Sequence, residues 1–254
     1  MPIFSIARLT ILDLIRRRVL VLLALFAVGL ILLSFPLREF TVGQWRRLIS
    51  DIGLGSIDLC ITLLAVFLGA SLIAGDLDRK TLYPLLSKPL SRASFISGKF
   101  LGLAAVLLFL GSVMVLGTWG VLWVAGEHGS GVLFQNLATI SVSGFVMGAI
   151  AIFFSSFTSV TLAGSFSLAI LLAGHLTSNL AFFSQRVPFA LGRLVMRGLA
   201  GGLPDLEALN LKDFAAHGQL LPLQALLPRL AYGLTYAAAA VSLAAAVFVR
   251  RDLK

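Results

Sequence analysis

The sequence has few charged residues and almost no cysteine. Only 12% of its 254 residues are Asp, Glu, Lys or Arg, whereas 59% are hydrophobic. A soluble domain needs a charged, mixed surface around its core, so this composition indicates a chain whose outer surface faces lipid. The single cysteine, Cys60, lies inside an apolar run, which excludes an intramolecular disulfide and a cysteine-based metal cluster. We interpret it as a small buried hydrophobic residue.

Motifs for catalysis, nucleotide binding and metal binding are also missing. Gly98-Lys99 resembles the end of a phosphate-binding loop, but Phe100 replaces the Ser or Thr, and Ala93 stands where the first Gly belongs. The three histidines have no metal-ligand spacing, and no protease arrangement is present. The chain is therefore not predicted to be an enzyme or to hold a metal or cofactor of its own.

The formal net charge of +9 does not indicate a nucleic-acid partner. The cations gather at the ends of apolar runs, where membrane proteins place them, and not in a patch interleaved with aromatic residues. If both termini are cytoplasmic, the inner segments carry more cations than the outer ones, so we expect that orientation. The lipid bilayer is the first predicted partner.

Six apolar runs are long enough, or nearly so, to cross a membrane. We predict an all-α membrane protein that forms one transmembrane domain over residues 1–254, with an amphipathic interfacial helix over 1–18. Residues 184–224 form a long extracytoplasmic segment, expected to be partly helical and to lie on the outer leaflet or re-enter it. The predicted spans are Val19–Phe35, Ile52–Ala74, Phe100–Ala125, Val132–Phe154, Val160–Phe183 and Ala225–Val249.

A few polar residues fall inside these runs, where hydrocarbon makes them costly unless they are paired or face water. Asp58 is either a substrate or ion contact in a translocation pathway, or an interfacial carboxylate or helix N-cap. His175 and Asn179 share one helix face and either line the pathway or hold helices together by hydrogen bonds. Gln135 and Asn136, at the start of the fourth run, are interpreted as interfacial caps.

The polar segment 75–99, between the second and third runs, keeps a hydrophobic stripe among its charges. A helix from Leu77 can present Leu82, Tyr83, Leu85 and Leu86 before a turn over Ser87–Arg92. Ser91 or Ser94 can then cap the helix that leads into the third span. A solvated loop would not need the stripe, so we predict a cytoplasmic helical elbow that docks onto another protein.

The same segment resembles the signature of type-two ATP-binding-cassette (ABC) transporter permeases. That signature has an acidic pair, Gly-Thr, a leucine-rich turn, S-x-P-x-S-R and a final G-K-x-L-G. Asp76 and Asp78 match the acidic pair, and Thr81 matches the Thr, although Lys80 stands where Gly is common. The remaining matches are Leu85-Leu86-Ser87-Lys88-Pro89-Leu90-Ser91-Arg92 and Gly98-Lys99-Phe100-Leu101-Gly102.

This resemblance implies a half-transporter in a bacterial-type cytoplasmic (inner) membrane. A second permease chain, identical or similar, would complete the pathway, and two ABC ATPase subunits, which bind the ATP and Mg²⁺, would dock under the elbow. Within this group the sequence resembles the accessory permeases of nitrous-oxide reductase maturation systems, and an extracytoplasmic partner is a further candidate. The residues implied in ATPase coupling are Asp76, Asp78, Thr81, Leu82, Tyr83, Leu85, Leu86, Ser87, Lys88, Pro89 and Arg92.

Three functions remain open at this point. The first is an ABC exporter, for which apolar pathway residues favour lipid-like or amphiphilic cargo. The second is an ion-coupled secondary transporter that uses Asp58 and His175. The third is a non-transporting membrane anchor for an ATPase in an envelope complex.

Overall fold

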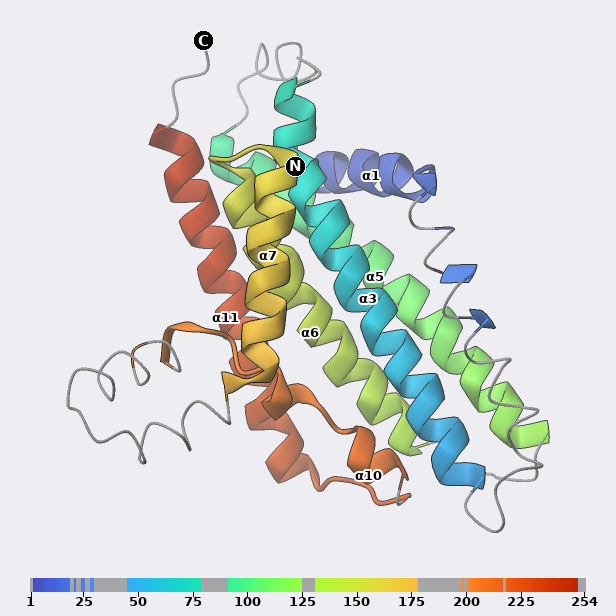
Figure 1. Ribbon diagram of the computed structural model, residues 1–254. Coiled ribbons are helices and arrows are strands. Elements are labelled where there is room, and N and C mark those ends of the chain that lie inside the picture. The colour runs from blue at the N-terminus through green and yellow to red at the C-terminus, as the bar shows by residue number, and fades with distance from the viewer. Residues whose placement is uncertain are drawn as a thin grey trace.

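The computed structural model describes residues 2–18, 45–78, 91–124, 131–177, 201–216 and 218–250, with single positions between 21 and 29 and at Gly198. Within these ranges the regular structure is entirely helical. Four long helices form a bundle, α7 lies beside them, and α1 lies across one end (Figure 1). The elements are α1 (Pro2–Ile15), α3 (Trp45–Asp78), α5 (Arg92–Val124), α6 (Gly131–Ser155), α7 (Val160–His175), the 3-10 helix η2 (Glu207–Leu209), α10 (Lys212–Ala216) and α11 (Leu223–Arg250).

Four of the six predicted spans are confirmed as helices long and apolar enough to cross a membrane: Ser50–Asp76, Arg92–Trp123, Gly131–Ser155 and Leu223–Arg250. The fifth predicted span is a helix only over Val160–His175, which is shorter, and its predicted end lies outside the described residues. Most of the first predicted span, and the elbow residues 79–90, also lie outside them.

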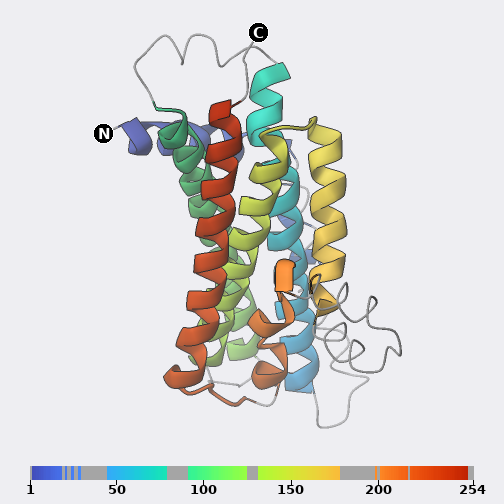
Figure 2. The ribbon, with the colours of Figure 1, turned by 90° about the vertical axis from the view of Figure 1, so that its left-hand side faces the viewer.

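The bundle has an α1 end and an α10 end, each named after the helix that lies there. At the α1 end lie α1, the end of α3, the start of α5 and the end of α11 (Figures 1 and 2). At the α10 end lie α10, the starts of α3, α6 and α11, and the end of α5. The start of α1 and the end of α11 therefore lie at the same end of the bundle. A much larger share of α3 and α6 than of α5 and α11 is buried, so α3 and α6 form the inside of the bundle.

Glycines let the helices approach closely. A Cβ atom on Gly69 of α3 would lie 2.8 Å from Ala151 Cβ and 3.1 Å from the Gly148 carbonyl oxygen of α6. On α6, a Cβ on Gly144 would lie 2.7 Å from Ile61 of α3. Small residues at such contacts bring backbones together, and van der Waals packing then holds helices that share no hydrophobic driving force in lipid.

The expected N-terminal helix is confirmed as α1, which packs against the start of α5. Ile6, Thr10 and Leu14 are buried in this contact, while Phe4 and Ile15 remain exposed. The helix therefore presents apolar side chains on two sides. One side meets α5, and the other is left for the membrane interface that an amphipathic helix of this kind occupies.

We expect Gly102→Ala to destabilise the protein by displacing α1. A Cβ there would lie 2.6 Å from Thr10 Cβ and 2.8 Å from the Ala7 carbonyl oxygen, and such overpacking costs about 1–3 kcal/mol. Gly120→Ala is the matched control on the same helix, because its Cβ would meet open space. It should leave stability unchanged or raise it by up to ~1 kcal/mol through helix propensity. Thermal unfolding in detergent compares the two; an equal effect would contradict the close docking of α1.

Candidate functional site

The two flanks of the polar segment are joined by an ion pair at the α1 end. Asp76, near the end of α3, lies 2.6 Å from Lys99 Nζ on α5, and both side chains are largely buried. The same ammonium lies 5.6 Å from the centre of the Phe95 ring. Charge attraction in a partly buried site therefore holds the end of α3 against the start of α5.

Arg92, the first residue of α5, connects this helix to the end of α11. Its Nη1 donates hydrogen bonds to the carbonyl oxygens of Phe248 (3.2 Å) and Val249 (3.1 Å). These carbonyls belong to the last turn of α11, where a cation also compensates the helix dipole. The Phe95 and Phe248 rings stack beside this contact, with centroids 6.1 Å apart.

The start of α5 is capped as the sequence predicts. The Ser94 backbone N–H donates to Ser91 Oγ at 3.1 Å, so Ser91 is the N-cap residue. Helix α5 therefore begins eight residues before the predicted membrane span, at the end of the predicted turn over Ser87–Arg92.

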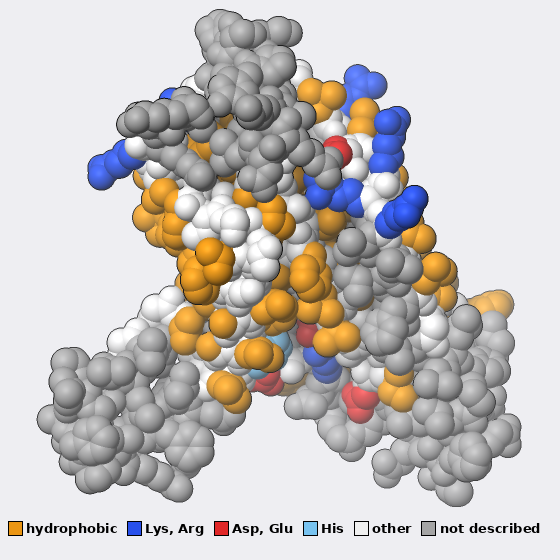
Figure 3. Space-filling model, turned by 45° about the horizontal axis from the view of Figure 1, so that its top comes forward, with side chains coloured by type: hydrophobic (Ala, Val, Ile, Leu, Met, Phe, Trp, Pro, Cys, Tyr) orange, Lys and Arg blue, Asp and Glu red, His pale blue; other side chains and the backbone are white. Residues whose placement is uncertain are grey.

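The last turns of α3 are held from two other sides. Ser155 Oγ of α6 accepts a hydrogen bond from the Ala74 N–H (2.9 Å) and donates one to the Ala70 carbonyl (2.6 Å). Arg17, after α1, donates to Ser71 Oγ at 2.7 Å. Helices α5 and α6, together with Arg17 after α1, thus contact the last turns of α3. Around this end the surface gathers Lys and Arg side chains above an apolar band (Figure 3).

Of the predicted coupling residues, the structure places Asp76 and Arg92 in these contacts. Asp78 is the last residue of α3, but its side chain is not among those described. Residues 81–89, which include the Leu82–Leu86 stripe, lie outside the described residues. Their role in docking stays a prediction.

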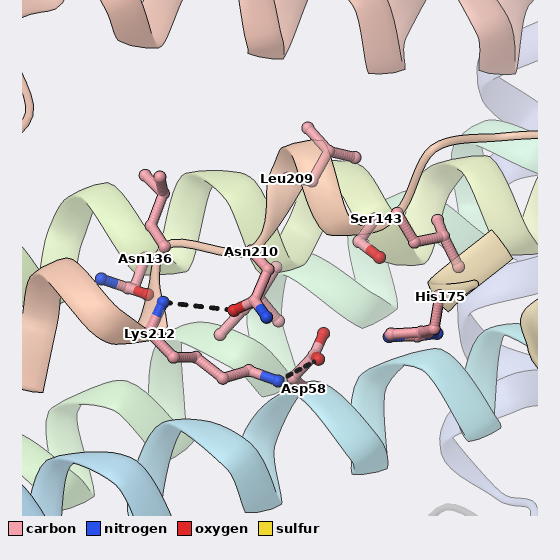
Figure 4. Close-up of a pocket in the computed structure, with 10 residues that line it drawn as sticks. Asp58, Asn136, Ser143, His175, Leu209, Asn210 and Lys212 are labelled. Carbon is pink, nitrogen blue, oxygen red and sulfur yellow. Dashed lines mark hydrogen bonds and ion pairs between the residues drawn. The ribbon is translucent and has the colours of Figure 1, made fainter. Parts of the chain in front are cut away.

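A second polar cluster lies toward the α10 end, around a small cavity between α3, α6, α7 and the segment 206–212 (Figure 4). Two of the three predicted pathway residues, Asp58 and His175, line this cavity. The third, Asn179, lies outside the described residues. The lining residues are Asp58, Asn136, Ile140, Ser143, His175, Leu206, Leu209, Asn210, Leu211 and Lys212.

Asp58 is paired with Lys212 across this cavity. The Lys212 ammonium donates to Asp58 Oδ2 at 2.6 Å, and both side chains are mostly buried. The backbone N–H of Lys212 also donates to Asn210 Oδ1 at 3.2 Å, which fixes the start of α10. Because α3 begins at Trp45, the alternative of Asp58 as a helix N-cap is wrong. The residue lies inside the helix and meets its charge partner there.

His175 and Asn136 line the same cavity from α7 and α6. His175 Nδ1 lies 2.9 Å from the Leu171 carbonyl oxygen, which can only accept, so Nδ1 carries the hydrogen. The Asn136 amide donates to the Val132 carbonyl at 3.0 Å, while its Oδ1 is buried with no hydrogen-bond partner. Nδ1 of His175 and one of the two amide hydrogens of Asn136 are therefore used in these backbone contacts.

The expected interfacial caps at the start of α6 are wrong, because this helix begins four residues earlier, at Gly131. Gln135 instead exchanges two hydrogen bonds with the backbone of Leu221. Its Nε2 donates to the Leu221 carbonyl (2.8 Å), and its Oε1 accepts from the Leu221 N–H (3.0 Å). Asn136, one residue further, is almost fully buried.

The segment 201–206 is also held in place, which the sequence did not show. Tyr236 Oη of α11 donates to the Gly202 carbonyl (2.9 Å), and Tyr232 Oη accepts from the Asp205 N–H (2.9 Å). The Leu206 N–H donates to the Gly174 carbonyl at 3.3 Å. The part of the long outer segment that is described is therefore partly helical, as expected, and folds back against the bundle.

The sequence analysis did not predict that Lys212 would lie in this site. The available signal was Asp58 itself, since a carboxylate inside an apolar helix requires a cationic partner from the chain. Within the described ranges, no group of three or more His, Cys, Asp and Glu side chains is placed to hold a metal ion.

These helices and contacts define a multi-pass helical membrane protein with a polar contact network at one end and a paired charge inside. A model of the ABC-2 family transporter proteins matches residues 4–197, well over half of the chain. The chain belongs to this family and is a permease subunit of an ABC transporter, which works with a separate ABC ATPase. No curated protein matches it.

We expect the Asp58–Lys212 pair to show strong coupling in a double-mutant cycle. Asp58→Asn or Lys212→Met alone leaves a charge without its partner in a mostly buried site, which is costly, whereas the double variant removes both charges. The coupling free energy should be about 1–3 kcal/mol in thermal or denaturant unfolding.

Asp13→Asn is the control, because it makes the same change in the Asp13–Arg17 pair, whose carboxylate is half exposed. Exposed ion pairs contribute about 0–1 kcal/mol, so this variant should change stability by no more than that. Additive effects of the Asp58 and Lys212 substitutions would contradict the buried pair.

Proposed function

We propose that this permease is driven through the segment 75–99 by two ABC ATPase subunits that dock on its leucine stripe. The observation that carries the proposal is the contact network at the segment's two ends. Asp76–Lys99 joins α3 to α5, and Arg92 joins α5 to the last turn of α11. A force applied to the segment would thus reach three of the four long bundle helices together.

The proposed dimer follows from the half-transporter architecture. Two such chains, identical or similar, would enclose the pathway, with ATP and Mg²⁺ bound by the ATPases. The α1 end would face the cytoplasm of a bacterial-type inner membrane, with both termini there. The Lys and Arg side chains gathered at this end support that orientation, because cytoplasmic flanks of membrane helices are rich in cations. An extracytoplasmic partner would then meet the α10 end.

We propose export of lipid-like or amphiphilic cargo. The surfaces of α5 and α11 support this, because they expose large apolar side chains such as Phe109, Trp123 and Leu234. Cargo with an apolar part could move along such surfaces without leaving a hydrocarbon-like environment.

The cavity around Asp58 favours one second candidate, an ion-coupled secondary transporter. Its ionisable residues, Asp58 and His175, line a common space, as an ion or proton pathway would require. The two functions differ in their energy source. Uptake into inside-out vesicles that requires ATP and the ATPase supports the first, and uptake abolished by a protonophore in the absence of ATP supports the second.

The docking prediction can be tested by co-purification. Leu85→Asp and Leu86→Asp should each abolish recovery of the ATPase with the tagged permease, because a buried carboxylate at a protein contact is strongly unfavourable. Folding of the variants is checked by their elution and unfolding temperature in detergent.

Leu223→Asp is the matched control at the other end of the molecule. Leu223 is the first residue of α11 and is exposed, and an acidic residue is favourable in a first helical turn. This variant should retain the ATPase. Recovery of the ATPase with folded Leu85→Asp and Leu86→Asp variants would refute docking on this stripe.

A further inference from the structure

Three of the side chains that line the cavity near the α10 end carry groups that can accept hydrogen bonds. Asp58 contributes a carboxylate, which only accepts when ionised. Asn136 contributes Oδ1, which is buried without a partner, on a residue only 1% exposed. His175 donates through Nδ1 to Leu171, so the Nε2 of the neutral ring is also an acceptor.

The cation that pairs with the Asp58 carboxylate is Lys212, which comes from a surface segment. Lys212 is the first residue of the five-residue helix α10, and its side chain extends to Asp58, which lies between Lys212 and His175 (Figure 4). An ammonium group has three N–H donors and a positive charge, and therefore matches a cavity with a carboxylate and further acceptors. Asn136 Oδ1 still has no hydrogen-bond partner, so Lys212 does not supply a donor to every acceptor that lines the cavity.

We propose that this cavity is a binding site for a primary ammonium group, which Lys212 occupies in this structure and an external amine occupies when Lys212 is withdrawn. Withdrawal of Lys212 alone would leave the Asp58 carboxylate largely buried and unpaired, which is strongly unfavourable, so a replacement cation is favoured. The amine can be a free small molecule or the head group of an amphiphile. The inference concerns binding only and does not depend on the ATPase, so either proposal can fail without the other.

The experiment is chemical rescue of Lys212→Ala in the purified full-length protein. This substitution removes the tethered ammonium and leaves space for methylammonium. A ligand that binds the folded state raises the unfolding temperature, here by about 3–6 °C at ten times the half-saturating concentration. For a ligand with two non-hydrogen atoms, half-saturation is expected at roughly 10–100 mM. Should Lys212→Ala be too unstable to purify, Lys212→Ser replaces it, because its small polar side chain leaves similar space and can hold a water molecule beside Asp58.

Three controls make the result specific. Wild type should not respond, because Lys212 fills the site, and Asp58→Asn/Lys212→Ala should not respond, because the carboxylate is gone. Tetramethylammonium, which has no N–H donor, and potassium at equal ionic strength should not stabilise Lys212→Ala.

Butylammonium distinguishes the two possible sources of the amine. Half-saturation at a lower concentration than methylammonium supports the head group of an amphiphile, and half-saturation at equal concentrations supports a small free amine.

The proposal is overturned if methylammonium gives no stabilisation, or if it stabilises the double variant equally. It is also overturned if tetramethylammonium or potassium acts as well as methylammonium, since the effect would then be one of general ionic screening. A Lys212→Ala protein that is stabilised by acidification and not by methylammonium would show that Asp58 takes up a proton instead of an amine.

Discussion

Polar groups inside the spanning helices must find partners within the protein, because hydrocarbon offers none. Most do so locally: Thr62 and Ser112, for example, donate to backbone carbonyls one helical turn earlier. Ser155 reaches another helix and bonds to the α3 backbone. Among the described residues, Ser141 Oγ and Asn136 Oδ1 are buried without a hydrogen-bond partner, and Asn136 lines the cavity in which the charge of Asp58 is neutralised from a distant segment.

Two helices, α3 and α11, connect the polar contacts at the two ends of the molecule. Asp76 and Asp58 lie on one helix, 18 residues apart by their numbers, which is about 27 Å along its axis. Helix α11 likewise carries the carbonyls that Arg92 contacts at one end and Tyr232 and Tyr236, which hold the segment before α10, toward the other. A displacement of α3 at the α1 end therefore reaches Asp58 along one continuous helix, whereas a displacement of α11 reaches Lys212 through the segment 202–211 that its two tyrosines hold.

Much of this fold follows from the sequence alone. The length of the apolar runs predicted four of the long helices, and Ser91 predicted the start of α5, because hydropathy and capping are local properties. The partners of Asp58 and Gln135 could not be predicted, since Lys212 and Leu221 are 154 and 86 residues away in the chain. Such pairs depend on how the outer segment folds back, which no local pattern encodes. The leucine stripe of residues 82–86 remains a prediction.

The central claim is that a separate ATPase drives rearrangement of this bundle, and a distance measurement tests it most directly. In a Cys60→Ala background, which removes the only native cysteine, spin labels at Leu116→Cys and Leu227→Cys would report on exposed positions of α5 and α11. Pulsed electron paramagnetic resonance on the permease–ATPase complex should show the distance distribution between the labels shifting when ATP is added. A complex that hydrolyses ATP with an unchanged distribution would contradict the account.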